Sequence, residues 1–109
     1  MSFDKETLRK RIEASNFIEN NGTVIRTINH LHCVYNKLKT IKSVLNMELD
    51  EIVDSVNYLY EEGYIHLRHI DSKEAASLAD TNFSDLEAKL TAKGIRFIAG
   101  KIKDDCIDL

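Results

Sequence analysis

The segment from residue 49 to residue 70 constrains the fold of this chain more than any other part of its sequence. Its first half spaces apolar residues three and four positions apart, as one face of a helix requires: Leu49, Ile52, Val53, Val56, Leu59 and Tyr60. Gly63 closes this helix, and the alternation in YIHLRHI, residues 64–70, then indicates a strand. The segment predicts a mixed α+β domain with four nearly fully buried side chains: Leu49, Ile52, Val56 and Leu59.

The sequence before residue 49 predicts three helices. The first covers residues 4–20, with Asp4 as its cap and Asn20-Asn21-Gly22 as its stop signal, because Asn and Gly tolerate left-handed backbone. Thr23 would cap a second helix, with Val24, Ile28, Leu31 and Tyr35 on one face, and a third covers residues 38–45. Residues 1–21 are therefore predicted to form a separate N-terminal helix, which we interpret as a dimerisation arm.

The sequence after residue 70 predicts a hairpin and a closing helix. Residues 71–82 are small and polar, so they form a turn or mobile tip. The alternation from Phe83 to Leu90 predicts a second strand, with Leu86, Ala88 and Leu90 facing inward. Thr91 can cap a last helix that carries Ile95, Ile98 and Ile102 on one stripe. Two strands are too few to stand alone, so they must pack on the helices.

Two runs of sequence carry a resemblance to a known family. Residues 39–65, KTIKSVLNMELDEIVDSVNYLYEEGYI, resemble the turn and second helix of many winged-helix regulators, which end in Glu-Glu-Gly-Tyr-Ile before the wing. Residues 87–105 resemble the "LT-x-KG" start of the last helix. Together they resemble an uncharacterised family of small winged-helix proteins of Mu-like phages and prophages. The resemblance implies a mostly helical α+β winged helix-turn-helix with an extra N-terminal helix, a two-stranded wing with its tip at residues 71–82, and a closing C-terminal helix.

Composition limits the class of protein further. The 109 residues fit one domain spanning residues 1–109, and the chain contains no proline, which favours long helices. The uncharged stretches are too short to cross a bilayer, and MSFDKETLRK lacks the apolar core of a signal peptide, so we expect a cytoplasmic protein without membrane contact. In that reducing compartment Cys33 and Cys106 should stay free thiols.

The chemistry-bearing residues favour a protein that is not an enzyme. None of the sequence motifs of phosphate-cradling loops or nucleophile elbows is present. The cluster His30, His32 and Cys33 does not place three ligands on one helix face, so neither a metal nor another cofactor is predicted. The carboxylate pair Asp104/Asp105 is interpreted as a frayed tail.

The distribution of charge bears directly on DNA binding, the usual role of a winged helix. Residues 21–45 carry four cations and no carboxylate, whereas residues 46–64 carry six carboxylates and no cation. The predicted recognition helix therefore lacks the donors and positive charge that major-groove readers need. If the protein is a DNA-associated transcriptional regulator of double-stranded DNA, we expect it to bind through basic residues elsewhere: Lys37, Lys39, Lys42, Arg68 and Lys73.

A protein-interaction adaptor is the alternative hypothesis, since winged helices also pair subunits. Tyr58 is predicted on the polar face of its helix, near Asp54, and Phe97 beside the apolar stripe of the last helix. Exposed aromatic residues of this kind often mark interfaces. We therefore predict Asp54, Tyr58 and Phe97 as contacts to a protein partner, and a homo-oligomer. Both hypotheses stay open at the level of sequence.

Overall fold

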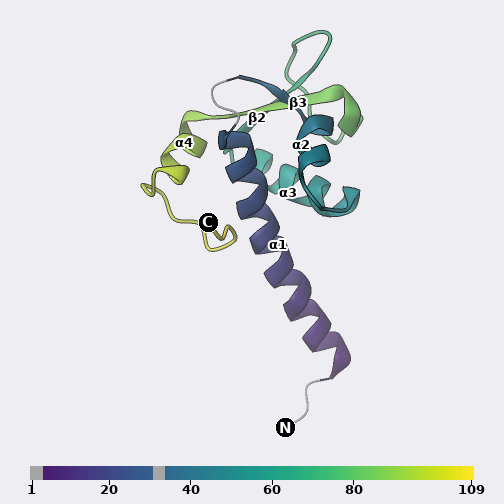
Figure 1. The fold of residues 1–109 in the computed structure, drawn as a ribbon, viewed down its shortest axis with the longest axis vertical. Helices are drawn as coiled ribbons and strands as arrows, with labels where there is room; N and C mark the ends of the chain where they lie inside the picture. Colours follow the sequence, from purple (N-terminus) through teal and green to yellow (C-terminus); the bar gives the residue numbers. More distant parts are fainter. Residues whose placement is uncertain (1–3, 31–33) are drawn as a thin grey trace.

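The computed structural model describes residues 4–30 and 34–109, which contain four α-helices and one three-stranded antiparallel sheet (Figure 1). The elements follow in the order α1 (Lys5–His30), β1 (Asn36–Lys37), α2 (Leu38–Val44), α3 (Leu49–Glu61), β2 (Ile65–His69), a 3-10 turn (Phe83–Asp85), β3 (Leu86–Leu90) and α4 (Ala92–Ile98). The predicted α+β class is confirmed. The predictions made for Leu31, His32 and Cys33 fall outside the described residues. No helix in the part of the chain that the structure describes is long and apolar enough to span a membrane.

Helix α1 is a single helix of 26 residues, so the predicted stop at residues 20–22 is wrong. Asn21 is fully buried, and its side-chain amide donates to the carbonyl of Cys106 at 2.9 Å. A Cβ on Gly22 would lie 1.7 Å from the carbonyl oxygen of Asp108. The C-terminal segment therefore packs against Asn21 and Gly22 in the middle of α1, and both residues are helical. Thr23 is not a cap, because its hydroxyl donates to the Glu19 carbonyl within the same helix.

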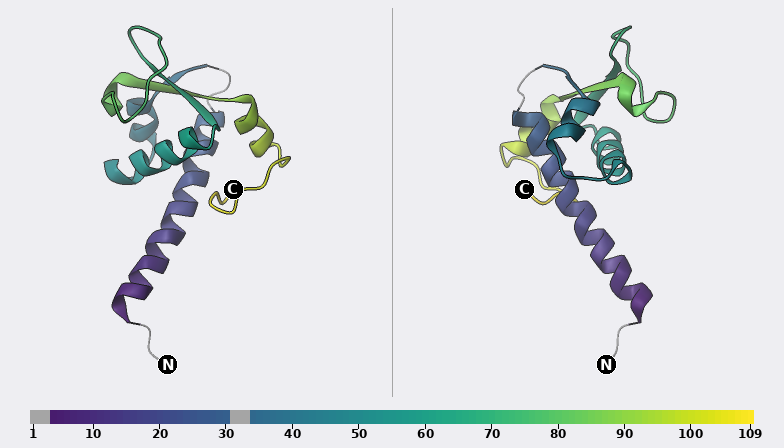
Figure 2. Two further views of the ribbon diagram at one scale, coloured as in Figure 1. Left: turned by 180° about the vertical axis from the view of Figure 1, so that it is seen from behind. Right: turned by 45° about the vertical axis from the view of Figure 1, so that its right-hand side comes forward.

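The sheet contains one strand more than the sequence predicts. Strand β3 lies between β1 and β2, with Ile65 opposite Leu90 and Asn36 opposite Ala88. The second hairpin strand begins at Leu86, because residues 83–85 form the 3-10 turn that precedes it. The two views of Figure 2 show the sheet lying across one end of the helices α1 to α3, with α4 beside it.

The core lies between α1, α2, α3 and the sheet. Ile52, Val56 and Leu59 are fully buried, as predicted. Leu49 is half exposed, so its predicted burial is wrong: it is the first residue of α3, and the buried positions of the helix begin at Ile52. Ser55 takes the fourth buried position of the helix instead.

The side of α4 that faces the core matches the predicted stripe only in part: Ile98 is partly buried against the core, but Phe97 is buried and Ile95 is not. Thr91 caps it as expected, accepting a hydrogen bond from the Gly94 amide at 3.0 Å, but the helix ends at Ile98 and not at Ile102. A Cβ on Gly94 would meet the carbonyl oxygen of Tyr64 at 2.2 Å, so the helix docks through this glycine. That contact turns Phe97, three residues later, inward and leaves Ile95 half exposed.

We expect Val56→Ala to lower the free energy of unfolding by about 1–3 kcal/mol, through lost apolar burial and the cavity that it leaves. Leu49→Ala is the matched control on the same helix, and because Leu49 is half exposed it should cost well under half as much. Denaturant titration of both variants measures the difference. Equal losses would contradict the assigned inner face of α3.

Candidate functional site

Three lysines form a basic surface at the start of α2. Lys37 is the last residue of β1 and the N-cap of α2, and Lys39 and Lys42 lie on the helix. Lys37 and Lys39 are exposed, and Lys42 is half-buried. No ion pair joins any of the three to a carboxylate within residues 4–30 and 34–109. These three residues, the lysine segment, therefore keep their positive charge available to a partner.

The two other predicted DNA-binding residues are engaged inside the protein. The Arg68 guanidinium donates to the Glu87 carboxylate at 2.6 Å, and the Lys73 ammonium lies 3.2 Å from the same oxygen. Arg68 also stacks over the Tyr35 ring, 3.6 Å from its centroid. Lys73 adopts left-handed backbone, with φ of 62°, in the turn that folds the wing tip back toward β2. Arg68 and Lys73 are therefore already paired with Glu87 in the folded protein, and DNA binding through these two residues stays a prediction.

Glu87 is the anchor of this cluster, although the alternation of β3 predicts an exposed side chain there. It is only 6% exposed, because Arg68 and Lys73 cover it from β2 and the wing tip. Burial raises the pKa of Glu87, but the hydrogen bonds and charges of these two cations outweigh burial and hold the pKa below its usual value. Arg68 and Glu87 lie directly opposite each other in the β2–β3 register, so the pair becomes visible once that register is known.

The exposed side of α3 borders an acidic groove. The groove lies between α1 and α3, has a volume of about 300 Å³, and is lined by Glu13, Asn16, Phe17, Asn20, Asp50, Glu51 and Asp54. We call it the acidic groove. Asp54 is exposed, as the protein-partner hypothesis requires. Four carboxylates and no cation line the groove, so its chemistry favours a positively charged partner.

The sequence suggests that Tyr58 is free to contact a protein partner, but its hydroxyl and its ring both have partners within the chain. Its hydroxyl donates to the Asp104 carboxylate at 2.8 Å, and the Tyr64 hydroxyl donates to the same carboxylate, also at 2.8 Å. The Phe17 ring meets the Tyr58 ring edge to face, with 5.5 Å between centroids. Tyr58 therefore ties the C-terminal segment to α3.

Asp104 is likewise an ordered internal acceptor, and the prediction of a frayed tail at Asp104/Asp105 is wrong for Asp104. Burial raises the pKa of the Asp104 carboxyl, but the Cys106 amide and the hydroxyls of Tyr58 and Tyr64 outweigh burial and hold the pKa below its usual value. The same network raises the pKa of both tyrosines, through burial first and the nearby carboxylate second. A spacing argument could not find this contact, because it joins positions more than forty residues apart in sequence.

Phe97 does not form part of an exposed surface. Its ring is 4% exposed and packs on the Tyr64 ring, with 5.2 Å between centroids. The expected exposure of Phe97 is wrong, because the close approach of Gly94 to the Tyr64 carbonyl turns Phe97 inward.

The described residues offer no arrangement for metal chemistry. Across residues 4–30 and 34–109, no group of three or more His, Cys, Asp and Glu side chains is placed to hold an ion. The Cys106 thiol is free and half-buried.

Comparison of the chain with protein-family models, with curated protein sequences and with solved structures finds no match. The lysine segment and the acidic groove are therefore the surfaces that bear on the function of the protein.

Proposed function

We propose that the chain is a winged helix-turn-helix protein of the phage or prophage type, without enzymatic activity. The element order α1-β1-α2-α3-β2-β3 supports this, as does a sheet with β3 between β1 and β2. Helices α2 and α3 are joined by the four residues 45–48, and β2 and β3 form a hairpin with a long tip that serves as the wing. Fold alone does not fix a role, so the role must come from the surface.

The proposed role is that of a DNA-associated regulator that contacts the phosphate backbone. The observation that carries this role is the lysine segment, whose cations have no carboxylate partner among the described residues. The exposed face of α3 presents Asp50, Asp54 and Glu61, which phosphates would repel. We therefore place α2 and β1 against the duplex and keep α3 out of the major groove. Binding of this kind depends on phosphate charge and reads little sequence.

A salt titration of binding to random-sequence duplex DNA tests this role. Changing Lys37, Lys39 and Lys42 together to Gln should weaken binding to all sequences and flatten the slope of log affinity against log salt by up to about 2.7. The matched control changes three exposed cations at the other end of the domain to Gln: Arg96, Lys101 and Lys103. The control should keep most of the affinity. An equal loss in both variants, or no binding by the parent protein at low salt, would contradict the role of the lysine segment.

A protein-interaction adaptor is the second candidate, and the acidic groove is the observation that favours it. With Arg68 and Lys73 neutralised and Tyr58 and Phe97 engaged internally, Asp54 is the one residue predicted as a protein contact that remains exposed. A groove lined by four carboxylates suits a basic segment of a protein better than a nucleic acid. Absence of duplex binding at low salt would favour this candidate.

A further inference from the structure

The N-terminal part of α1 extends from the domain without a neighbouring element. Residues 5–16 are all exposed and form the free end of the long helix in Figure 1, and Leu8 and Ile12 are 50% and 51% exposed. Both lie one helical turn apart on the same side. The helix at residues 5–12, here called the arm, continues α1 beyond the domain and leaves Leu8 and Ile12 uncovered.

The arm is strongly basic. It carries four cations, Lys5, Arg9, Lys10 and Arg11, against one carboxylate, Glu6. Arg9 is partly neutralised, because it pairs with Glu6 and lies 4.0 Å from Glu13. The side chains of Lys5 and Lys10 have no ion-pair or hydrogen-bond partner in the described part of the chain. An acidic partner surface would complement this charge.

The acidic groove begins on α1 directly after the arm. Glu13, Asn16 and Phe17 line one wall, and Asp50 and Asp54 line the other. Asp54 has no hydrogen-bond or ion-pair partner within residues 4–30 and 34–109, so the groove keeps its negative charge. The half-buried Phe17 ring adds an apolar surface to the α1 wall. The negative charge of the groove therefore complements the positive charge of the arm, and the Phe17 ring offers an apolar contact to Leu8 or Ile12.

We propose that the arm of one copy of this chain lies in the acidic groove of a second copy, in a two-fold symmetric dimer. Within one chain the arm continues the helix that forms one wall of the groove, so it cannot lie in that groove, although Arg9 lies 4.0 Å from the lining residue Glu13. Two α1 helices that run antiparallel bring each arm beside the groove of the other copy. Both arms are then in contact with a groove, so no binding surface is left for a third copy and the assembly closes as a dimer. The same contact would cover Ile12 and place Lys5 or Lys10 against Asp50 and Asp54. This inference does not require that the protein bind DNA.

A charge swap tests the dimer with the full chain. One variant carries Asp50→Lys and Asp54→Lys in the groove, and the other carries Lys5→Glu and Lys10→Glu in the arm. All four positions are exposed, so the fold should persist, which circular dichroism checks. Sedimentation equilibrium should show that the parent protein dimerises at low salt and dissociates as salt rises. Each variant alone should raise the dimer dissociation constant by about 100-fold or more, since like charges then face each other.

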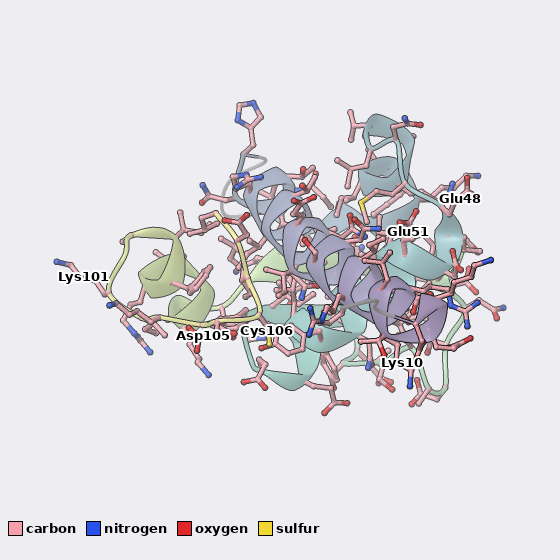
Figure 3. The ribbon with its side chains drawn as sticks, turned by 90° about the horizontal axis from the view of Figure 1, so that it is seen from below. Lys10, Glu48, Glu51, Lys101, Asp105 and Cys106 are labelled. Carbon is pink, nitrogen blue, oxygen red and sulfur yellow. The ribbon has the colours of Figure 1, made fainter. Side chains whose placement is uncertain are left out.

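The decisive measurement combines the two variants. An equimolar mixture should form a heterodimer, because each arm then meets a groove of opposite charge, and the quadruple variant should dimerise with itself. The matched control reverses the charges of Lys101 and Lys103. Figure 3 shows Lys101 on the opposite side of the molecule from Lys10. That control should leave the dimer unchanged. A parent protein that stays monomeric at low salt, a dimer that survives both single-surface reversals, or a mixture that fails to associate would each overturn the proposal.

Discussion

Arg68→Ala is expected to lower the free energy of unfolding by about 2–3 kcal/mol at neutral pH, because it leaves the buried Glu87 carboxylate with only half of its compensating charge. The loss should be smaller than that of a fully buried pair, since Lys73 stays in contact. It should still exceed the loss from Lys73→Ala, because the Lys73 side chain is 53% exposed and that of Arg68 is 29% exposed. Chemical denaturation of both variants measures the order of the two losses.

The same variant has a defined pH dependence. The pKa of Glu87 is lowered in the folded protein, so its ion pairs contribute stability above the ordinary glutamate pKa. That contribution is lost as the pH falls through the folded-state pKa. The difference in the free energy of unfolding between the parent protein and Arg68→Ala should therefore be largest at neutral pH and decrease in acid. Asp104, whose pKa is also lowered, titrates in both proteins and cancels in the comparison. A gap that stays constant into acid would show that Arg68 acts through its packing on Tyr35 alone.

Gly22→Ala is expected to cost about 2–3 kcal/mol, although alanine is ordinarily the better helix former. The added methyl carbon would lie 1.7 Å from the backbone oxygen of Asp108, so the C-terminal segment must leave its place on α1. That movement exposes Ile107, which is 7% exposed, and removes the hydrogen bond from Asn21 to Cys106. Limited proteolysis should accordingly cut the C-terminal segment of the variant faster.

A shortened background separates the close contact from the general effect of a substitution. In a chain that lacks residues 106–109 the clash is absent, and Gly22→Ala should then stabilise the helix by about 1 kcal/mol. The sign of the effect should thus reverse between the two backgrounds. An equal loss in both would show that the glycine is needed for some reason other than the approach of Asp108.

The features that the sequence predicts correctly are those with a local cause. Asp4 caps α1 by accepting from the Thr7 amide at 3.0 Å, and Gly63 ends α3 with a positive φ of 81°. Thr91 caps α4, and the apolar spacing of α3 identifies three of its four buried residues. Each depends on neighbours within a few positions, which periodicity and capping preferences describe well.

The features that the sequence analysis missed depend on distant parts of the chain. Asn21 and Gly22 resemble a helix stop, but here they accommodate residues 106–108, and nothing near them in sequence reveals that role. Strand β1 is two residues long and is defined by its pairing with β3 some fifty positions later. Glu87 is buried because of cations on β2 and the wing tip, whereas strand alternation alone places it outside.

The return of the C-terminal segment to the middle of α1 also sets the order in which the protein can fold. The hydrogen bonds from Asn21 to Cys106 and from Arg26 to Asp108 span 85 and 82 residues, whereas α2, α3 and the hairpin are joined by much shorter loops. Long loops close later because their closure costs more chain entropy. During synthesis, residues 18–26 of α1 therefore lack this contact until residues 106–108 have emerged. We expect the docking of residues 106–108 to be a late folding step, and until it is complete the uncovered part of α1 is open to proteases and to association with other chains.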